Sequence, residues 1–457
     1  MKTGMILDRR SVIAGAAALP AAAWPASARA DNAPLRPQGL DAAHFGVHAG
    51  APDDQTKTLQ RAIDQAAQRR APLWLGPGVY HAAGLNLPAG AQITGVRGAT
   101  RLLLTRPASL MVSTRSDAIT LADLTLDGGK IPLPENAGLL HLENGRDLRV
   151  ADCAVHQAGG TGIMCRSMQG QVTGTTVTDA ADTAMFSMDG INMLFAGNVI
   201  RGSGNGGIRI WQSQKRTDGA IVVDNQIHDT RADAGGSGQN GNAINVYRAG
   251  KVIVRGNQIG KAAFSAVRGN SASQIEVVAN NCADIGEVAL YAEFEFENAV
   301  FSGNTVDGAA FGIAVTNFKE GGRLATVQGN ILRNITRERP DGTDPNDGYG
   351  IGIGVEADTA VTGNVIENAS RIGIAVGNGV YMRDCTVTGN TVRGAPYGIT
   401  VSVTKGAGGA VVSHNLISGA RRGAVVGADG QKIVAADLAL VAPGAYPQLT
   451  VSANQVR

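Results

Sequence analysis

The chain has 457 residues, of which 62 are glycine and only 4% are aromatic, and its formal net charge is +2. A globular α/β enzyme of this length usually carries more aromatic bulk. Abundant Gly together with Val, Ile, Thr and Asn is instead typical of many short strands joined by tight turns. No run of about eighteen apolar residues follows the N-terminus, so we expect no membrane span in the mature protein. The near-neutral charge gives no overall field for nucleic acid, which we exclude as a partner.

The first thirty residues have the pattern of an export signal. Arg9 and Arg10 form a twin-arginine pair, an apolar stretch covers residues 12–24, and Ala28-Arg29-Ala30 is typical of a signal peptidase site. We predict that residues 1–30 are a twin-arginine signal peptide, with the export machinery as its partner and a periplasmic or secreted mature protein. The signal carries a net charge of +3, which leaves about −1 on the mature chain. Recognition of a polyanion must therefore come from a local patch.

Four cysteines are spread through the chain without the spacing of a metal-ligand motif. Because twin-arginine cargo folds before export, in a reducing cytoplasm, we do not expect disulfides to drive folding. The prediction is four small buried thiols, with no metal and no cofactor. These residues are Cys153, Cys165, Cys282 and Cys385.

Residues 31–105 are predicted to form an N-terminal cap and the first coils. Asp53-Asp54-Gln55-Thr56 offers helix-capping side chains, and apolar residues follow at helical spacing over residues 58–70. Two short strands, residues 72–75 and 79–80, then flank a Gly-Pro-Gly turn. This order closely resembles the N-terminal cap of the pectate-lyase-like β-helix superfamily, which would cover the open end of a solenoid.

Residues 106–457 are predicted to be β-helix repeats, because a Gly/Asp/His-Asn-x-Ile/Val motif recurs through them. Its spacing of about 25 residues is typical of stacked coils. Asn tolerates left-handed backbone angles at the turn between strands, and its amide can bond to the same Asn of the next coil. The motif asparagines are Asn198, Asn225, Asn257, Asn281, Asn304, Asn330, Asn364, Asn390 and Asn415, with weaker copies at Asp123, Asp152 and Thr175.

A second motif, Gly/Ala-apolar-x-apolar-x, lies between the asparagines, as at residues 207–211 and 398–402. Period-two alternation places its Ile and Val inside and its variable positions outside. With the signal and the cap, these repeats resemble a bacterial family of twin-arginine-translocated repeat proteins of uncharacterised function, within the pectate-lyase-like superfamily. The resemblance spans nearly the whole chain and brings no known activity. It implies an all-β fold, a single-stranded right-handed parallel β-helix with an N-terminal helical cap, for which we expect about ten to twelve coils.

The outward positions of the second motif change character along the chain. The last coils carry Ala, Gly, Thr and Ser there, whereas the middle coils carry Arg, Asn, Tyr, Trp and Glu. Aromatic faces stack on sugar rings, Arg binds carboxylates and amides bond to hydroxyls, so we predict a groove for an anionic polysaccharide. An ordinary solvated sheet face is the alternative. The candidate catalytic residues are Tyr247, Arg268, Tyr291 and Glu293. The candidate substrate-binding residues are Arg209, Trp211, Asn245, Asn270 and Glu356.

Three long segments, residues 212–219, 229–242 and 336–349, enter or leave these strands. Long insertions in a solenoid often build the walls of its binding face, so we expect these segments to border the groove. Neutral drift in the length of turns is the alternative explanation.

The sequence leaves open whether the protein is an enzyme. β-Elimination on a uronate is the favoured reaction, with Arg268 binding the carboxylate and Tyr247 or Tyr291 moving the proton. Inverting hydrolysis by Glu293 and Glu356, two coils apart, is the second hypothesis. The third is a non-catalytic glycan-binding or structural envelope protein. The Gly-His-Gly and clustered Asp patterns of polygalacturonases and pectate lyases are absent, and none of the seven His residues lies on the candidate strands, which weakens both enzyme hypotheses.

Overall fold

The computed structural model describes residues 39–316, 322–341, 343, 348–438 and 445–457. The predicted signal peptide and its cleavage site lie outside these residues. Within the described ranges, no helix is long and apolar enough to cross a membrane. Nearly every described element is a short β-strand, and the strands form two sheets, one of 29 strands and one of 15.

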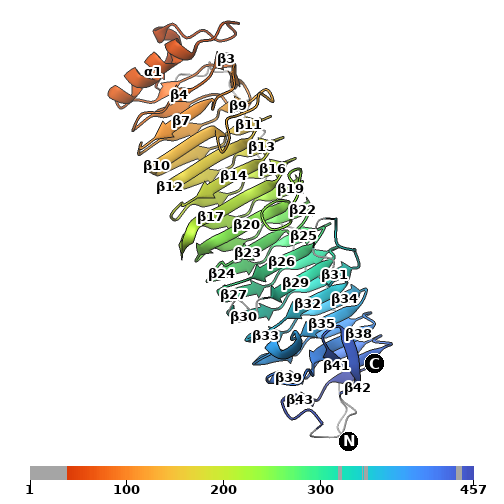
Figure 1. Ribbon diagram of the computed structural model, residues 1–457. Helices are drawn as coiled ribbons and strands as arrows, with labels where there is room; N and C mark the ends of the chain where they lie inside the picture. The colour runs from red at the N-terminus through yellow and green to blue at the C-terminus, as the bar shows by residue number, and fades with distance from the viewer. Residues whose placement is uncertain (1–38, 317–321, 342, 344–347, 439–444) are drawn as a thin grey trace, which may run out of the picture. The chain divides into compact units, whose positions relative to one another are not determined.

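Successive coils stack through parallel strand pairing. One coil consists of β20 (Asn242–Gly250), β21 (Ile253–Arg255) and β22 (Gln258–Ala262). The next coil repeats these three strands, beginning with β23 (Val267–Asn270), and each strand pairs in parallel with its counterpart (Figure 1). The described chain from residue 39 onward is therefore a parallel β-solenoid, as the repeats predicted.

The solenoid has more coils than the ten to twelve that we expected. The smaller sheet receives one strand from each coil and contains 15 strands among the described residues. Its early strands, up to β13 (Thr176–Thr178), precede Asn198 and come from coils that lack the motif asparagine. These coils stack as the later ones do, so the motif alone underestimates their number.

The helix α1 (Thr56–Gln68) lies at the N-terminal end of the described solenoid, next to the first coils (Figure 1). It begins two residues before the predicted range of 58–70. Asp54 contributes to its start, because its Oδ1 accepts a hydrogen bond from the Thr56 backbone N–H at 2.8 Å. The buried residues of α1 follow the predicted apolar spacing and are Leu59, Ala62, Ile63 and Ala66.

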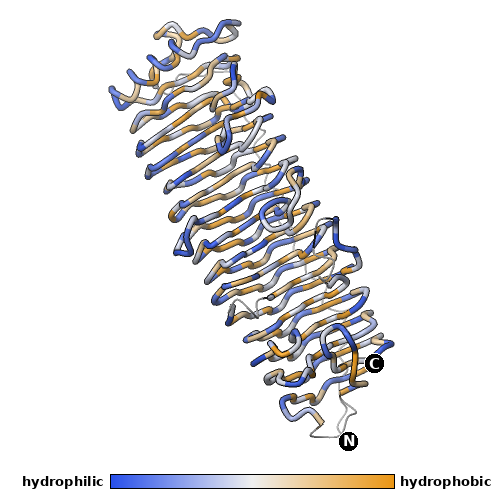
Figure 2. Tube along the Cα trace, viewed as in Figure 1, coloured by the Kyte–Doolittle hydropathy of each residue, from blue (hydrophilic) through white to orange (hydrophobic). Residues whose placement is uncertain are grey.

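Period-two alternation decides which side chains fill the solenoid. Ile208, Ile244 and Val267 are register partners on three successive coils, and all three are fully buried. The residues between them point away from this core. Figure 2 shows the resulting alternation of apolar and polar residues along the coils. The predicted inward positions are therefore confirmed.

The motif asparagines form a continuous buried column. In Asn304, Nδ2 donates to the Val277 carbonyl at 2.8 Å and to Oδ1 of Asn330 at 2.9 Å, and Oδ1 accepts from the Asn280 backbone N–H at 2.9 Å. The column thus satisfies backbone groups that the stacking of coils removes from water. One predicted member was wrong, because Asn280 occupies the column while Asn281 begins the next strand and is exposed.

The predicted reason for asparagine was also wrong in one respect. The left-handed backbone belongs to the residue before each asparagine, as in Asp224 (φ 55°), Gly303 (φ 63°) and His414 (φ 57°). Gly, Asp or His at this position makes the turn. Asparagine is required for its amide, which bonds to the coils on both sides.

All four cysteines are free and buried, as predicted. Burial raises the pKa of the thiols to about 12 in Cys153, Cys165 and Cys282, and to about 11 in Cys385. At neutral pH these side chains are protonated, and they pack as small apolar groups.

Candidate functional site

The predicted site residues lie in two adjacent outward rows of one sheet. Register pairs place the first row on β17 (Gly206–Thr217), β20, β23 and β26 (Val288–Glu293). The first row holds Arg209, Asn245, Arg268 and Tyr291. The second row, two residues further along each strand, holds Trp211, Tyr247, Asn270 and Glu293. Glu356 follows Val355, the register partner of Val315, so it lies two coils beyond Glu293, as predicted.

Both rows continue onto earlier strands that the sequence analysis did not consider. These strands are β10 (Gly138–Ala151), β12 (Thr161–Thr173) and β14 (Thr183–Met188), which lie side by side with β17 (Figure 1). The first row gains His141, Met164 and Phe186, and the second row gains Glu143, Arg166 and Met188. The signal was present in the sequence, because the same period-two alternation extends through these strands.

Most of the predicted site residues are not exposed, contrary to expectation. Only 7% of Arg268, 3% of Glu293 and 2% of Asn245 is accessible, and Arg209 and Glu356 are also buried. The partly exposed members are Trp211, Tyr247, Asn270 and Tyr291. Their outward direction was predicted correctly, so the burial must come from chain segments that lie over the sheet.

One such segment is residues 231–241, which precede β20 and are called here the covering segment. The Gly238 carbonyl accepts a hydrogen bond from Nδ2 of Asn245 at 3.0 Å, and the Ser237 carbonyl accepts one from Arg268 at 2.8 Å. The sequence predicted this insertion as a wall of the groove. The structure shows that it lies directly over the first row.

A buried ion network occupies the C-terminal part of the predicted site. The Arg268 guanidinium donates to both carboxylate oxygens of Glu293, at 2.7 and 2.8 Å, and to Glu287 at 3.3 Å. Arg339, from the insertion at residues 336–349, donates to the other oxygen of Glu287 at 2.8 Å. Burial lowers the pKa of Arg268, but Glu293 and then Glu287 outweigh it and raise the pKa. Arg268 is therefore charged and already paired with protein carboxylates.

The two candidate tyrosines belong to different surroundings. The ring of Tyr291 lies 4.9 Å from the Arg268 guanidinium, and its hydroxyl accepts a hydrogen bond from Thr316 at 3.2 Å. The ring of Tyr247 packs edge-on against Trp211, with centroids 5.7 Å apart. Tyr291 is thus next to the ion network, whereas Tyr247 borders Trp211 of β17.

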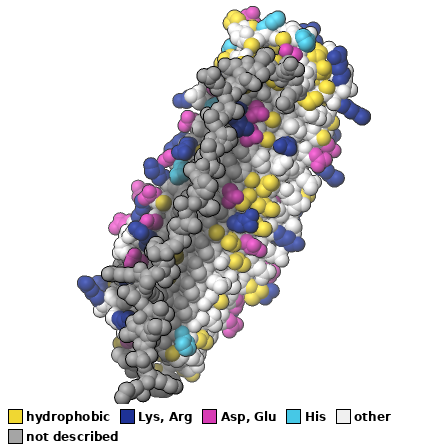
Figure 3. All heavy atoms as spheres, turned by 180° about the vertical axis from the view of Figure 1, so that it is seen from behind, with side chains coloured by type: hydrophobic (Ala, Val, Ile, Leu, Met, Phe, Trp, Pro, Cys, Tyr) yellow, Lys and Arg dark blue, Asp and Glu magenta, His cyan; other side chains and the backbone are white. Residues whose placement is uncertain are grey.

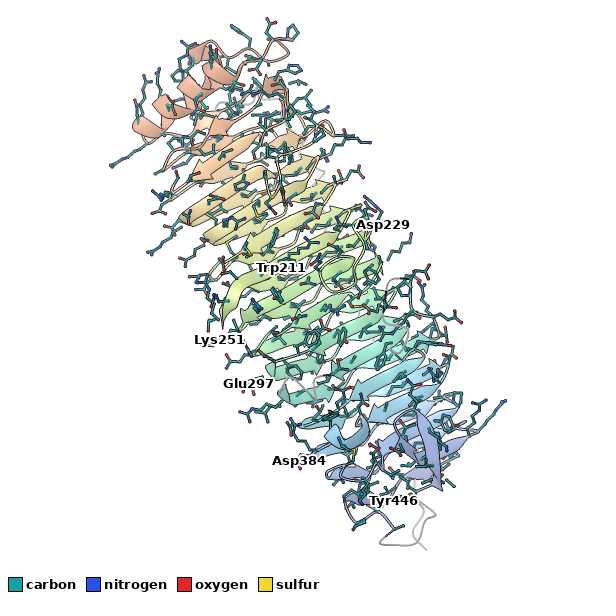
Figure 4. All side chains as sticks on the ribbon, in the orientation of Figure 1. Trp211, Asp229, Lys251, Glu297, Asp384 and Tyr446 are labelled. Atoms are coloured by element: carbon teal, nitrogen blue, oxygen red, sulfur yellow. The ribbon has the colours of Figure 1, made fainter. Side chains whose placement is uncertain are left out.

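An open groove of about 380 Å³ lies over β12, β14 and β17. Its lining includes residues 133–137 together with Gln239 and Asn240 of the covering segment. Phe186 and Trp211 form its aromatic floor, with ring centroids 5.1 Å apart and an interplanar angle of 78°. Trp211 lies on the sheet face about midway along the solenoid (Figure 4). Two of the predicted site residues, Arg209 and Trp211, line this groove. The groove lies on earlier coils than those of Tyr247, Arg268 and Tyr291, where the sequence predicted the centre of the site.

The Arg209 guanidinium lies against both aromatic rings of this floor. Its guanidinium carbon is 5.1 Å from the Trp211 ring centroid and 5.9 Å from that of Phe186, and it donates to Asn240 Oδ1 at 2.8 Å. Burial lowers the pKa of Arg209, and Asp182, 3.8 Å away, partly offsets the decrease. Asp182 is the more accessible partner, with 38% of its side chain exposed in the lining of the groove. Charged and aromatic groups therefore meet at one place.

His141 is held by hydrogen bonds on both ring nitrogens. Its Nδ1 accepts from the Gly138 backbone N–H at 3.2 Å, so the hydrogen lies on Nε2 and is donated to Glu143 at 2.9 Å. Arg166 pairs with the same carboxylate at 3.3 Å. The arrangement orients Glu143 and leaves neither nitrogen of this imidazole open as a general base.

The described residues contain no group of three or more His, Cys, Asp or Glu side chains arranged to hold a metal ion. On the side opposite to Figure 1, basic and acidic side chains are interspersed over the described surface (Figure 3). Charge recognition therefore depends on local arrangements such as the groove.

Comparison with known proteins supports the fold. A family model described as a right-handed β-helix region matches residues 114–227, and no curated protein matches the sequence. With the parallel pairing described above, this makes the fold a right-handed parallel β-helix, as predicted. The narrower resemblance to twin-arginine-translocated repeat proteins stays a prediction.

Two solved structures are similar over most of the chain. The N-terminal fragment of gene product 12 from bacteriophage Phi29 is 11% identical, with a TM-score of 0.58 over 88% of this chain and 74% of that one. The catalytic unit of a GH87 α-1,3-glucanase from Streptomyces thermodiastaticus strain HF3-3 is 14% identical, with a TM-score of 0.54 over 92% of this chain and 68% of that one. At such identities the likeness concerns the fold alone.

Proposed function

We propose that this protein binds a glycan in the groove over β12, β14 and β17. The observation that carries the proposal is the floor of the groove, where the Arg209 guanidinium lies against the paired rings of Phe186 and Trp211. Aromatic faces and a few convergent polar groups are what a sugar ring requires of a binding site. The guanidinium favours a glycan with carboxylate groups, and Asp182 offers an acceptor for hydroxyls.

A glycan panel with one substitution and one matched control tests this proposal. Uronate polymers, sulfated glycans and neutral glucans are titrated into the wild type, Trp211→Ala and Tyr381→Ala. Tyr381 is a 39% exposed aromatic residue on the 3-10 helix η2 (Gly379–Tyr381), outside the groove. We expect Trp211→Ala to weaken binding about tenfold or more and Tyr381→Ala to leave it unchanged. Equal affinity of both variants would place the site elsewhere.

β-Elimination on a bound uronate remains the reaction that we propose to test first. The role of Arg268 in this reaction changes, because its guanidinium is buried, pairs with Glu293 and Glu287 and does not line the groove. Tyr247 is the candidate proton-transfer residue next to the groove, since its ring contacts Trp211. An unsaturated uronide that absorbs in the ultraviolet would form with the wild type and not with Tyr247→Phe, while binding is retained. Binding without any product would favour a non-catalytic glycan-binding protein.

Inverting hydrolysis has less support from the geometry. Glu293 and Glu356 lie two coils apart, roughly 9.6 Å at the backbone, close to the separation that inversion requires. Both oxygens of Glu293, however, accept hydrogen bonds from Arg268, and one also accepts from Asn270 at 2.8 Å. A carboxylate held in this way is poorly placed to donate a proton to a leaving group. New reducing ends without ultraviolet absorbance would reverse this ranking.

A further inference from the structure

The covering segment bounds the groove on the side of the later coils. Gln239 and Asn240 belong to the groove lining, which contains no residue from β20 or any later strand. Immediately beyond, the Gly238 and Ser237 carbonyls bond to first-row residues of β20 and β23. The first row is therefore partly open at Phe186, buried at Arg209, Asn245 and Arg268, and partly exposed again at Tyr291.

Hydrogen bonds hold the covering segment in place. Asn205 Oδ1 accepts from the Ala234 backbone N–H at 2.8 Å, and the Asn205 carbonyl accepts from the Gly241 backbone N–H at 2.7 Å. Asn242 Nδ2 donates to the Asn240 carbonyl at 2.9 Å. Hydrogen bonds near both ends of the segment, at Ala234 and Gly241, and at Ser237 and Gly238 in between, hold it against the sheet.

The second insertion extends this cover. Arg339 donates a hydrogen bond to the Gly348 carbonyl at 2.8 Å, which links two residues of this insertion. It also donates to Glu287, which connects the insertion to the residue before β26. Glu287 in turn pairs with Arg268, which bonds to Ser237 of the covering segment. One chain of polar contacts thus joins both insertions over the first row.

We propose that the groove receives the end of a glycan chain, or a short oligosaccharide, and not an internal segment of a polymer. This inference rests on the proposed function. Its basis is the cover over Arg209, Asn245 and Arg268 of the first row, together with the small volume of about 380 Å³, near the lower limit of ligand pockets. A polymer that followed the first row would meet Asn240 and the covering segment after passing Phe186.

A length series of one glycan tests the inference. Oligosaccharides from the dimer upward, and the parent polymer, are titrated into the wild type by calorimetry. We expect affinity to reach a plateau within a few sugar units, with less than about twofold gain at greater length. The amount of protein that the polymer binds at saturation should be proportional to the concentration of its chain ends. Affinity that keeps rising with length, or polymer binding in proportion to total sugar units, would overturn the inference.

Two variants separate this result from failure of the proposed function. Replacement of residues 234–239 by a short Gly-Ser linker, and the milder Asn240→Ala, both weaken the closure next to Arg209. Each should extend the plateau to longer oligosaccharides, and unchanged length dependence in a folded variant would contradict the inference. If no glycan of any length binds the wild type, the proposed function itself has failed.

Discussion

The ion network predicts that Arg268→Ala destabilises the protein, although Arg268 points away from the solenoid core. The substitution would leave Glu293 and Glu287 buried, with side-chain exposures of 4% and 2%, and among the described residues Arg339 would still pair with Glu287. It would also remove the hydrogen bond to Ser237 that holds the covering segment. From the outward position alone, the sequence would predict intact folding.

The magnitude follows from these contacts. Removal of one partner of a buried ion pair costs roughly 3–5 kcal/mol, because an uncompensated charge stays behind. Arg333→Ala is the matched control, since Arg333 pairs with Asp307 at 3.2 Å with both side chains about half exposed, and such pairs contribute about 0–1 kcal/mol. The double variant Arg268→Met with Glu293→Gln removes one charge of each sign and should recover much of the loss.

Equilibrium unfolding in urea, followed by circular dichroism, measures these differences. The expected order of midpoints is wild type close to Arg333→Ala, then the double variant, then Arg268→Ala. The reasoning is refuted if Arg268→Ala unfolds at the same urea concentration as Arg333→Ala. It is also refuted if the double variant is less stable than Arg268→Ala alone.

Four further outcomes are expected. Asn280→Ala should lower the free energy of unfolding by about 2 kcal/mol or more, because it leaves buried backbone groups of the neighbouring coils without a hydrogen-bond partner. The control Asn281→Ala should change the free energy of unfolding by less than about 0.5 kcal/mol. Equal effects of the two substitutions would contradict the assignment of Asn280 to the column. Burial raises the pKa of Asp218 from 3.8 to about 6, so the folded protein holds the protonated carboxyl more tightly than the unfolded chain does. This preference stabilises the fold fully below pH 3.8, and about 3 kcal/mol of the free energy of unfolding is lost as the pH rises to about 6. The difference in unfolding free energy between wild type and Asp218→Asn, measured against pH, should show this fall, and a flat difference would exclude it. A thiol reagent at pH 8 should label none of the four cysteines in the folded protein and all of them in denaturant, so rapid labelling of native protein would argue against their burial. Replacement of Arg9 and Arg10 by Lys should trap the precursor in the cytoplasm of the native host, while unchanged secretion would count against twin-arginine export.

Local pattern was sufficient for the fold. The asparagine spacing and the alternation in strands such as β20 predicted stacked coils, inward Ile and Val, and outward Arg209 and Arg268, and all of these are present. Such features depend on contacts between a residue and its equivalent one coil away, so they repeat along the chain and are visible in the sequence. The exact member of the column between Asn257 and Asn304 was missed, because adjacent asparagines at 280 and 281 differ only in backbone phase.

The candidate site depended on contacts that no repeat encodes. Ser237 reaches Arg268 and Arg339 reaches Glu287 through insertions whose length and path follow no period. These contacts bury Arg268 and Glu293, which the sequence placed on an exposed face, and leave an open groove at Phe186 and Trp211. The sequence by itself determined the coils and the direction of each side chain, since both follow from local backbone geometry. Tertiary structure decided which outward side chains meet solvent, because that depends on where distant segments come to rest on the sheet.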